Sequence, residues 1–210
     1  MIEQRSEDWR AQRAGRITAS CFADAIAMNK KKPTEPTAAR TTYMRTVVAE
    51  ILSGRPKHEI SSKSLSWGTE AEVFARRAYE LETGLIVVKS EFVTHPLYDF
   101  IGASPDGLID DDGGLEMKCP HDEQVHIGTW LDGMPADHVA QVQGNMMVTG
   151  RKWWDFVSFD PRQNTDYQIY IERIERDDEY IDAVLLPGLL SFWSDVQAML
   201  EKMKMKRRAA

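Results

Sequence analysis

Two acidic residues and a lysine stand close together in residues 101–120, at Asp106, Glu116 and Lys118. The residues between Asp106 and Glu116 are typical of a strand, an acidic glycine-rich hairpin turn and a second strand. Because side chains alternate along a strand, Glu116 and Lys118 are expected on one face and Met117 on the other. Such a hairpin brings Asp106 next to Glu116, where both carboxylates can join around one cation.

The Asp…Glu-x-Lys set is the constellation of metal-dependent nucleases. Phosphodiester cleavage needs a cation that stabilises the charge of a phosphorane-like transition state and lowers the pKa of an attacking water. Mg²⁺ takes oxygen ligands, typically carboxylates, water and substrate oxygens, and Lys118 would orient the water or neutralise the phosphate. The alternative is a solvent-facing Glu116–Lys118 pair on an ordinary strand, with Asp106 in a simple turn, and these residues alone leave it open.

The composition is that of one soluble domain spanning residues 1–210, because 210 residues with 42% hydrophobic content can form a substantial core. No apolar run is expected to approach the roughly 20 residues of a membrane helix, and the polar N-terminus is unlike a signal peptide. Cys21 and Cys119 have no metal-type spacing and exclude a four-cysteine iron–sulfur cluster from this chain. These features predict a cytoplasmic protein with no membrane partner.

Charge is segregated along the chain, although the net charge is −7. Residues 1–57 hold eleven Lys and Arg against six Asp and Glu, whereas residues 58–210 hold fifteen against twenty-seven. A basic N-terminal third suits the binding of a phosphate backbone, and the acidic remainder suits a metal site.

Hydrophobic periodicity and turn residues predict an α/β fold. Helices are expected over residues 7–13, 20–28, 37–52, 66–83, 121–131, 137–147 and 177–205, the last interrupted at Pro187-Gly188. Strands are expected over residues 85–94, 100–109, 115–119, 152–160 and 167–174. In the helix over residues 66–83, the residues expected to face inward are Phe74, Ala75, Ala78 and Leu81. The order predicts a central mixed β-sheet of about five strands flanked by helices on both faces.

Further polar residues precede or open these helices. Arg13, Arg16, Thr18 and Ser20 would form a phosphate cradle at a helix N-terminus, or Thr18 and Ser20 would only cap the helix. Glu70 and Glu72 would serve the dipole of their helix, or one of them would face the metal.

Two glutamines and a basic segment carry the same kind of choice. Gln141 and its neighbour Gln143 would hold a phosphate or the attacking water, or would point to solvent. The basic residues 30–32 would follow a DNA strand, or lie solvated. The basic C-terminal tail is expected to be solvated.

Six motifs in order along the chain resemble the lambda exonuclease family, the YqaJ-like viral recombinases. They are Arg13-x-Gly15-x-Ile17-Thr18-Ala19-Ser20, Trp67-Gly68-x-x-x-Glu72, Ser104-Pro105-Asp106-Gly107, Gly114-Leu115-Glu116-x-Lys118-Cys119-Pro120, Ala140-Gln141-Val142-Gln143 and Asp160-Pro161-Arg162. Each motif is weak alone, but together they are specific and cover nearly the whole chain.

The resemblance implies a PD-(D/E)xK restriction-endonuclease-like core and a deoxyribonuclease. That enzyme would be a Mg²⁺-dependent processive exonuclease, with Mn²⁺ as a substitute, that digests linear double-stranded DNA from 5′ to 3′. It would release 5′-mononucleotides and leave a 3′ single-stranded overhang for recombination and double-strand break repair. The resemblance also implies a homotrimeric ring, a single-strand annealing protein as partner, and a phage or prophage origin in a bacterial host cell.

Residue by residue, the resemblance makes Asp106 and Glu116 metal ligands, with the main-chain carbonyl of Met117 as a third. It assigns activation of the nucleophile to Lys118, and it completes the catalytic site with Glu72 and Gln141. It also implies that the terminal 5′-phosphate is bound by Arg13, Ser20 and Ser104.

Two other functions remain as alternatives. A restriction-like endonuclease can use the same core, although no dedicated recognition segment is evident in the sequence. A non-catalytic DNA-end binding module would carry the same acids as structural groups only.

Overall fold

The computed structural model describes residues 6–57 and 63–209, and the chain divides into two compact units. The first unit comprises Met1–His58, Glu91–Ser104 and Asp177–Ala210, and the second comprises Glu59–Ser90 and Pro105–Arg176. Each unit is assembled from segments that are separate in the sequence. No change in composition marks the points at which the chain passes from one unit to the other. A single domain over residues 1–210 stays a prediction.

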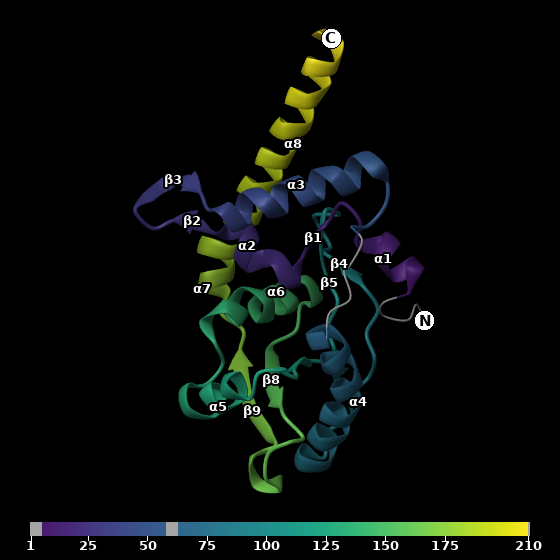
Figure 1. Ribbon diagram of the computed structural model, residues 1–210, viewed down its shortest axis with the longest axis vertical. Helices are drawn as coiled ribbons and strands as arrows, with labels where there is room; N and C mark the ends of the chain where they lie inside the picture. Colours follow the sequence, from purple (N-terminus) through teal and green to yellow (C-terminus); the bar gives the residue numbers. More distant parts are fainter. Residues whose placement is uncertain (1–5, 58–62, 210) are drawn as a thin grey trace. The chain divides into compact units, whose positions relative to one another are not determined.

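The first unit contains a small three-stranded sheet, a hairpin and several helices (Figure 1). Its elements are α1 (Glu7–Arg13), β1 (Ile17–Thr18), the 3₁₀ turn η1 (Ala19–Cys21), α2 (Phe22–Ile26), β2 (Met28–Asn29), β3 (Lys32–Pro36), α3 (Ala38–Ser53), β4 (Val93–Thr94), β5 (Ile101–Ala103), α7 (Asp178–Tyr180), the π-helical turn η4 (Ile181–Leu185) and α8 (Leu186–Ala209). β5 lies between β1, which it pairs in parallel, and β4, which it pairs antiparallel. The basic residues 30–32 lie in the turn and at the start of the second strand of the antiparallel β2–β3 hairpin.

Side-chain caps fix the starts of helices α1 and α3 in this unit. Ser6 accepts a hydrogen bond from the Trp9 amide, 3.2 Å away, at the start of α1. Thr37 caps α3 in the same way, and Gly54 ends it in the left-handed conformation with φ 64°. The helices predicted over residues 7–13 and 37–52 are therefore confirmed within one residue.

The C-terminal helical run continues through Pro187, so the predicted interruption there is wrong. Pro187 stands in the first turn of α8, where a missing amide hydrogen costs little, and the π-helical turn η4 precedes it. The buried side chains of the run recur every three or four residues, at Leu185, Leu189, Phe192 and Val196.

By length and composition, Asp178–Ala209 is long and apolar enough to cross a membrane. The expectation that no apolar run approaches this length is therefore wrong. Core helices of soluble proteins pass the same test, and one such helix is weak evidence for a membrane span.

The second unit is a four-stranded mixed sheet between helices (Figure 1). Its elements are α4 (Lys63–Thr83), β6 (Gly107–Ile109), β7 (Gly113–Lys118), α5 (Glu123–Asp132), the 3₁₀ turn η2 (Ala136–His138), α6 (Val139–Thr149), β8 (Trp153–Phe159), the 3₁₀ turn η3 (Thr165–Tyr167) and β9 (Ile169–Glu175). The strand order is β6-β7-β8-β9, with β7 and β8 parallel and the two outer pairs antiparallel.

The mixed α/β class is confirmed, but the number of strands in this sheet differs from the prediction. The strand predicted over residues 85–94 contributes only an isolated bridge between Val88 and Leu108. Its last residues instead form β4 in the first unit. The strand predicted over residues 100–109 is split into β5 and β6, because residues 104–106 leave the extended ladder.

The faces of the sheet follow the alternation of β8. Val157 and Phe159 pack with Tyr79 of α4 in one cluster. Trp154 and Phe156 pack with α6 in the other cluster. The sheet therefore has α4 on one face and α6 on the opposite face.

Helix α4 buries only part of the predicted face, because Ala75 is buried and Ala78 packs against the core as expected. Ala71, Ala75 and Tyr79 are buried, whereas Phe74 is 61% exposed and Leu81 is 82% exposed. The prediction that Phe74 and Leu81 face inward is wrong, because the small side chains at i and i+4 let the helix approach the sheet closely.

Candidate active site

The β6–β7 hairpin positions the acidic residues. Gly107 pairs with Leu115 and Ile109 with Gly113 in an antiparallel register. Asp110 in the turn has φ 44°, a left-handed conformation that Asp tolerates. A Cβ at Gly114 would lie 2.2 Å from the Trp154 ring, so this position requires glycine for the close approach of β8.

Asp106 immediately precedes Gly107, the first residue of β6. Because Gly107 pairs with Leu115, the same register places Asp106 opposite Glu116. Asp106 Oδ2 accepts a hydrogen bond from the Met117 amide at 2.7 Å. The Asp106 carbonyl accepts another from Arg76 Nη2 of α4, also at 2.7 Å. The carboxylate therefore takes the place of a strand partner for Met117, and Arg76 holds the main chain of the same residue.

Glu116 is only 3% exposed and accepts hydrogen bonds on both of its carboxylate oxygens. Its Oε1 lies 2.5 Å from Lys118 Nζ and 2.6 Å from Gln141 Nε2, and its Oε2 lies 3.1 Å from Asn145 Nδ2. Lys118 also donates to Gln141 Oε1 at 3.1 Å. The predicted shared face of Glu116 and Lys118 is confirmed, and Met117 lies in the hydrophobic cluster on the α4 side.

Burial and neighbouring charges shift the pKa values of Asp106 and Lys118 in this group. Burial, and then the charge of Glu116, raises the pKa of Asp106. Burial alone would lower the pKa of Lys118, but Glu116 and Asp106 outweigh it and raise that pKa. Glu72 adds to both upward shifts, so α4 brings a third carboxylate into electrostatic range. Repulsion among these carboxylates favours the binding of a further cation.

Asn145 and Arg76 are contacts of this group that the sequence analysis missed. Asn145 follows Gln141 by four residues on α6, so helical spacing is the signal that links them. The Asn145 side chain is buried, and its Oδ1 has no hydrogen-bond partner within the described part of the chain. Gln143, in contrast, donates to the Glu175 carbonyl at the far side of the helix.

An ion pair between the buried Asp160 and the partly exposed Arg162 holds the segment that follows Lys118. Asp160 is fully buried and binds Arg162 through two contacts, at 2.8 Å and 3.0 Å. Burial raises the pKa of Asp160, but hydrogen bonds from Arg162 and Gln163 outweigh it and leave the pKa lowered. Arg162 also donates to the carbonyls of Pro120 and His121. The guanidinium therefore joins the ends of β7 and β8.

A second polar cluster lies in the first unit around Arg13. Arg13 Nη1 donates to Ser104 Oγ at 2.8 Å. Arg13 Nη2 lies 3.4 Å from Thr18 Oγ1 and 3.5 Å from Ser20 Oγ. The guanidinium stacks on Trp9, 4.2 Å from the ring centroid. Neither helical turn that begins here has a side-chain cap, so the capping alternative finds no support. The structure brings Arg13, Ser20 and Ser104 together.

Comparison with known families now identifies the chain's relatives. The model of the YqaJ-like viral recombinase domain matches residues 8–152, which is more than half of the sequence. The chain belongs to the YqaJ-like viral recombinase family. The resemblance read from the six motifs is therefore confirmed.

Solved structures of exonucleases have a fold similar to that of this chain. The chain is 38% identical to an alkaline exonuclease, LHK-Exo, from Laribacter hongkongensis, with a TM-score of 0.87 and coverage of 97% of this chain and 99% of that one. The same exonuclease in complex with dAMP gives a TM-score of 0.88. A phage-related exonuclease from Haemophilus somnus 129PT shares the fold, with a TM-score of 0.68, 18% identity, and coverage of 90% of this chain and 96% of that one.

The chain is also similar in sequence to an uncharacterized protein, R354, of Acanthamoeba polyphaga mimivirus. It is 25% identical over 169 residues, which cover 74% of this chain. The matched segment spans only 29% of that protein's length.

Proposed function

We propose that this protein is a deoxyribonuclease that digests linear double-stranded DNA as a processive 5′ to 3′ exonuclease. It would release 5′-mononucleotides and leave a 3′ single-stranded overhang. The observation that carries the proposal is the Asp106–Glu116–Lys118–Gln141 group at the end of the hairpin. Support comes from the family and from LHK-Exo, a 38% identical exonuclease that was crystallised with dAMP, a deoxynucleoside monophosphate.

The donor groups of the hairpin fit Mg²⁺. Asp106, Glu116 and the main-chain carbonyl of Met117 are hard oxygen donors, which Mg²⁺ prefers, with Mn²⁺ as a substitute. Among the described residues, no three His, Cys, Asp or Glu side chains gather as a metal site. The protein would therefore supply few ligands, in keeping with a magnesium ion that retains water and contacts substrate phosphates. When bound, the ion would supply charge stabilisation and acidify a water molecule.

The surrounding side chains have separate tasks in this proposal. Lys118, held by Glu116 and Gln141, would orient the attacking water or neutralise the scissile phosphate. Gln141 would fix the Lys118 ammonium through its carbonyl oxygen and the Glu116 carboxylate through its amide. Glu72 would complete the acidic site from α4. The buried position of Glu116 would limit its motion and keep its oxygens pointed at the site.

The Arg13 cluster is proposed to bind the terminal 5′-phosphate. A guanidinium beside the hydroxyl groups of Ser20 and Ser104 offers charge-assisted hydrogen bonds to phosphate oxygens. Stacking on Trp9 restricts the guanidinium, so less freedom is lost when the phosphate binds. Preference for a 5′-phosphorylated end would give the enzyme its polarity.

The biological setting is proposed from the family. A viral recombinase domain suits a phage or prophage protein acting in the cytoplasm of a bacterial host, in DNA recombination and double-strand break repair. The proposed assembly is a homotrimeric ring, which would favour processive digestion by enclosing the DNA. A single-strand annealing protein is the proposed partner for the exposed 3′ strand.

The experiment compares linear and covalently closed circular duplex DNA with Mg²⁺. We expect the linear duplex to yield mononucleotides and the closed circle to remain intact, and chelation of the metal to stop digestion. Cutting of the closed circle would replace this proposal with the restriction-like endonuclease. Binding of DNA ends without any hydrolysis would replace it with the end-binding module.

A further inference from the structure

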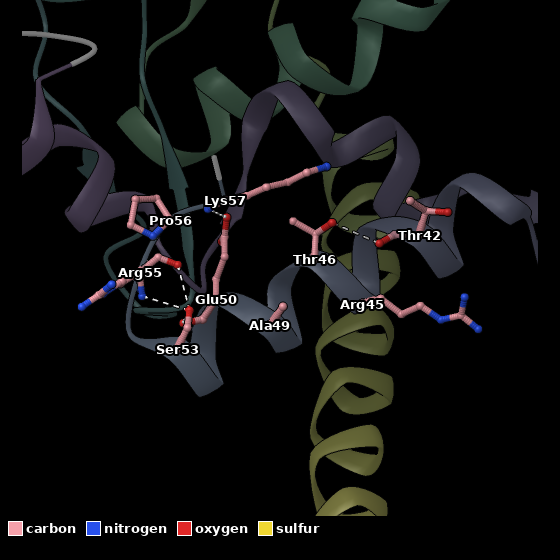
Figure 2. A pocket seen from close by; sticks show the side chains of 9 residues that line it. All are labelled: Thr42, Arg45, Thr46, Ala49, Glu50, Ser53, Arg55, Pro56 and Lys57. Atoms are coloured by element: carbon pink, nitrogen blue, oxygen red, sulfur yellow. Dashed lines mark hydrogen bonds between the residues drawn. The ribbon is translucent and has the colours of Figure 1, made fainter. Parts of the chain in front are cut away.

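A hollow of about 560 Å³ lies on the outer side of α3, within the first unit (Figure 2). The helix forms one wall, and the returning segment of residues 53–57 forms the other. The lining residues are Thr42, Arg45, Thr46, Ala49, Glu50, Ser53, Arg55, Pro56 and Lys57. None of them belongs to the Arg13 cluster or to the group around Asp106.

The returning segment is fixed to the helix by hydrogen bonds. The left-handed Gly54 reverses the chain, and the Lys57 amide donates to Glu50 Oε1 at 2.9 Å. The Arg55 amide donates to Ser53 Oγ at 3.2 Å. These contacts give the hollow a defined wall before any ligand binds.

The charges that line the hollow are mostly positive and unpaired. Arg45, Arg55 and Lys57 have exposed side chains, and no described residue forms an ion pair with them. Glu50 is the one carboxylate of the lining, and its two oxygens accept the amides of Lys57 and Gly15. The hollow therefore presents three cations and a carboxylate whose oxygens are already engaged.

The cations spread along the helix instead of converging on one point. Figure 2 shows the guanidinium groups of Arg45 and Arg55 on opposite sides, with the Lys57 side chain extending toward Thr46. Eight residues of helix between Arg45 and Ser53 rise roughly 12 Å. One DNA strand carries a phosphate every 3.4 Å or so along the helix axis, so this length matches roughly three to four phosphates.

We propose that this hollow binds the phosphodiester backbone of duplex DNA without reading its sequence, at a site separate from the groups that cleave it. None of the nine lining residues is aromatic, whereas surfaces for single strands combine cations with aromatic rings on which bases stack. The hydroxyls of Thr46 and Ser53 donate to carbonyls of their own segment, so the three cations and the Thr42 hydroxyl are the lining groups that can meet phosphate oxygens. Recognition by charge suits a uniform polyanion better than an acidic peptide. The inference rests on the proposed action on DNA.

The test measures duplex binding by fluorescence anisotropy in a chelator, so that no digestion occurs. The double variant Arg45→Glu/Lys57→Glu is compared with Lys202→Glu/Lys204→Glu, which makes the same charge change on the exposed end of α8. We expect the slope of log affinity against log salt to fall by about 2 for the first pair, at about 0.9 per phosphate contact. The α8 pair should keep the wild-type slope.

A second variant keeps the inference testable if the charge-reversal variants fail to fold. Ala49→Glu places a carboxylate in the hollow at an exposed helical position, where Glu is well tolerated, and should weaken duplex binding at least tenfold at low salt. Slopes that match in the two double variants, or wild-type affinity in Ala49→Glu, would overturn the inference. So would tighter binding of polyglutamate than of duplex at this hollow. Digestion assays with Mg²⁺ report separately on the proposed exonuclease, so either idea can fail alone.

Discussion

At the scale of single residues, the sequence pattern predicted some contacts of the candidate active site but not others. Alternation along a strand predicted that Glu116 and Lys118 share a face, and their side chains lie 2.5 Å apart. Gln141 lies on helix α6, and the sequence pattern left solvent exposure open for it, so only the family resemblance assigned it to the catalytic site. Asn145 escaped notice because an amide on a helix usually faces solvent, and only the folded sheet brings it to Glu116.

At the same scale, Arg13→Ala should slow digestion of 5′-phosphorylated ends far more than of 5′-hydroxyl ends. A charge-assisted hydrogen bond contributes about 1.5–3 kcal/mol, which corresponds to roughly ten- to hundredfold in rate. The measurement is the initial rate on two duplexes that differ only in the terminal phosphate.

Arg10→Ala on the same helix serves as the control for the loss of a positive charge. It should slow both ends alike or neither. Equal slowing of the two ends by Arg13→Ala would remove Arg13 from the proposed phosphate site.

Among the elements, those with clear caps and strong alternation were predictable. α1, α3 and β8 follow their capping residues and their alternation, whereas the strand predicted over residues 85–94 does not form. Val87 and Val88 have high β-propensity, but propensity decides little where a single neighbouring residue is available for pairing. In α4 the stripe of Ala71, Ala75 and Tyr79 faces the sheet, whereas Phe74 and Leu81 do not.

Two substitutions on α4 test its orientation. Tyr79 is fully buried and donates a 2.6 Å hydrogen bond to Asp155, so Tyr79→Ala should lower the free energy of unfolding by about 3–5 kcal/mol. Phe74→Ala removes a similar ring from an exposed position and should cost less than about 1 kcal/mol. Denaturant unfolding of both variants measures the difference, and a larger loss for Phe74→Ala would reverse the orientation.

The ion pair of Arg162 and Asp160, which joins the ends of β7 and β8, can be tested by substitution. Arg162→Ala would leave the buried Asp160 carboxylate without its cation, so it should destabilise the protein by about 3–5 kcal/mol. Lys152→Ala breaks an ion pair with Asp112 that is exposed on both sides, and should cost at most about 1 kcal/mol. Similar unfolding midpoints for the two variants would show that Arg162 contributes no more than a surface charge.

At the scale of the whole molecule, the sequence indicated the fold class and the order of most elements, but not the division into units. Both units are discontinuous in sequence. Residues 91–104 belong to the first unit, although in the sequence they separate two segments of the second unit. Local periodicity reports on neighbours in sequence and cannot report on such long-range assembly. The charge segregation has the same limit, because it does not say which surface of a unit binds DNA.

The most direct test of the central claim is the rate at which Asp106→Asn digests a linear 5′-phosphorylated duplex with Mg²⁺. Asn keeps the shape of the side chain and a hydrogen-bond acceptor for the Met117 amide, so fold and DNA binding should be retained. Loss of one oxygen ligand should lower the rate at least about a hundredfold. A wild-type rate in this variant, with unfolding and binding also unchanged, would contradict the account.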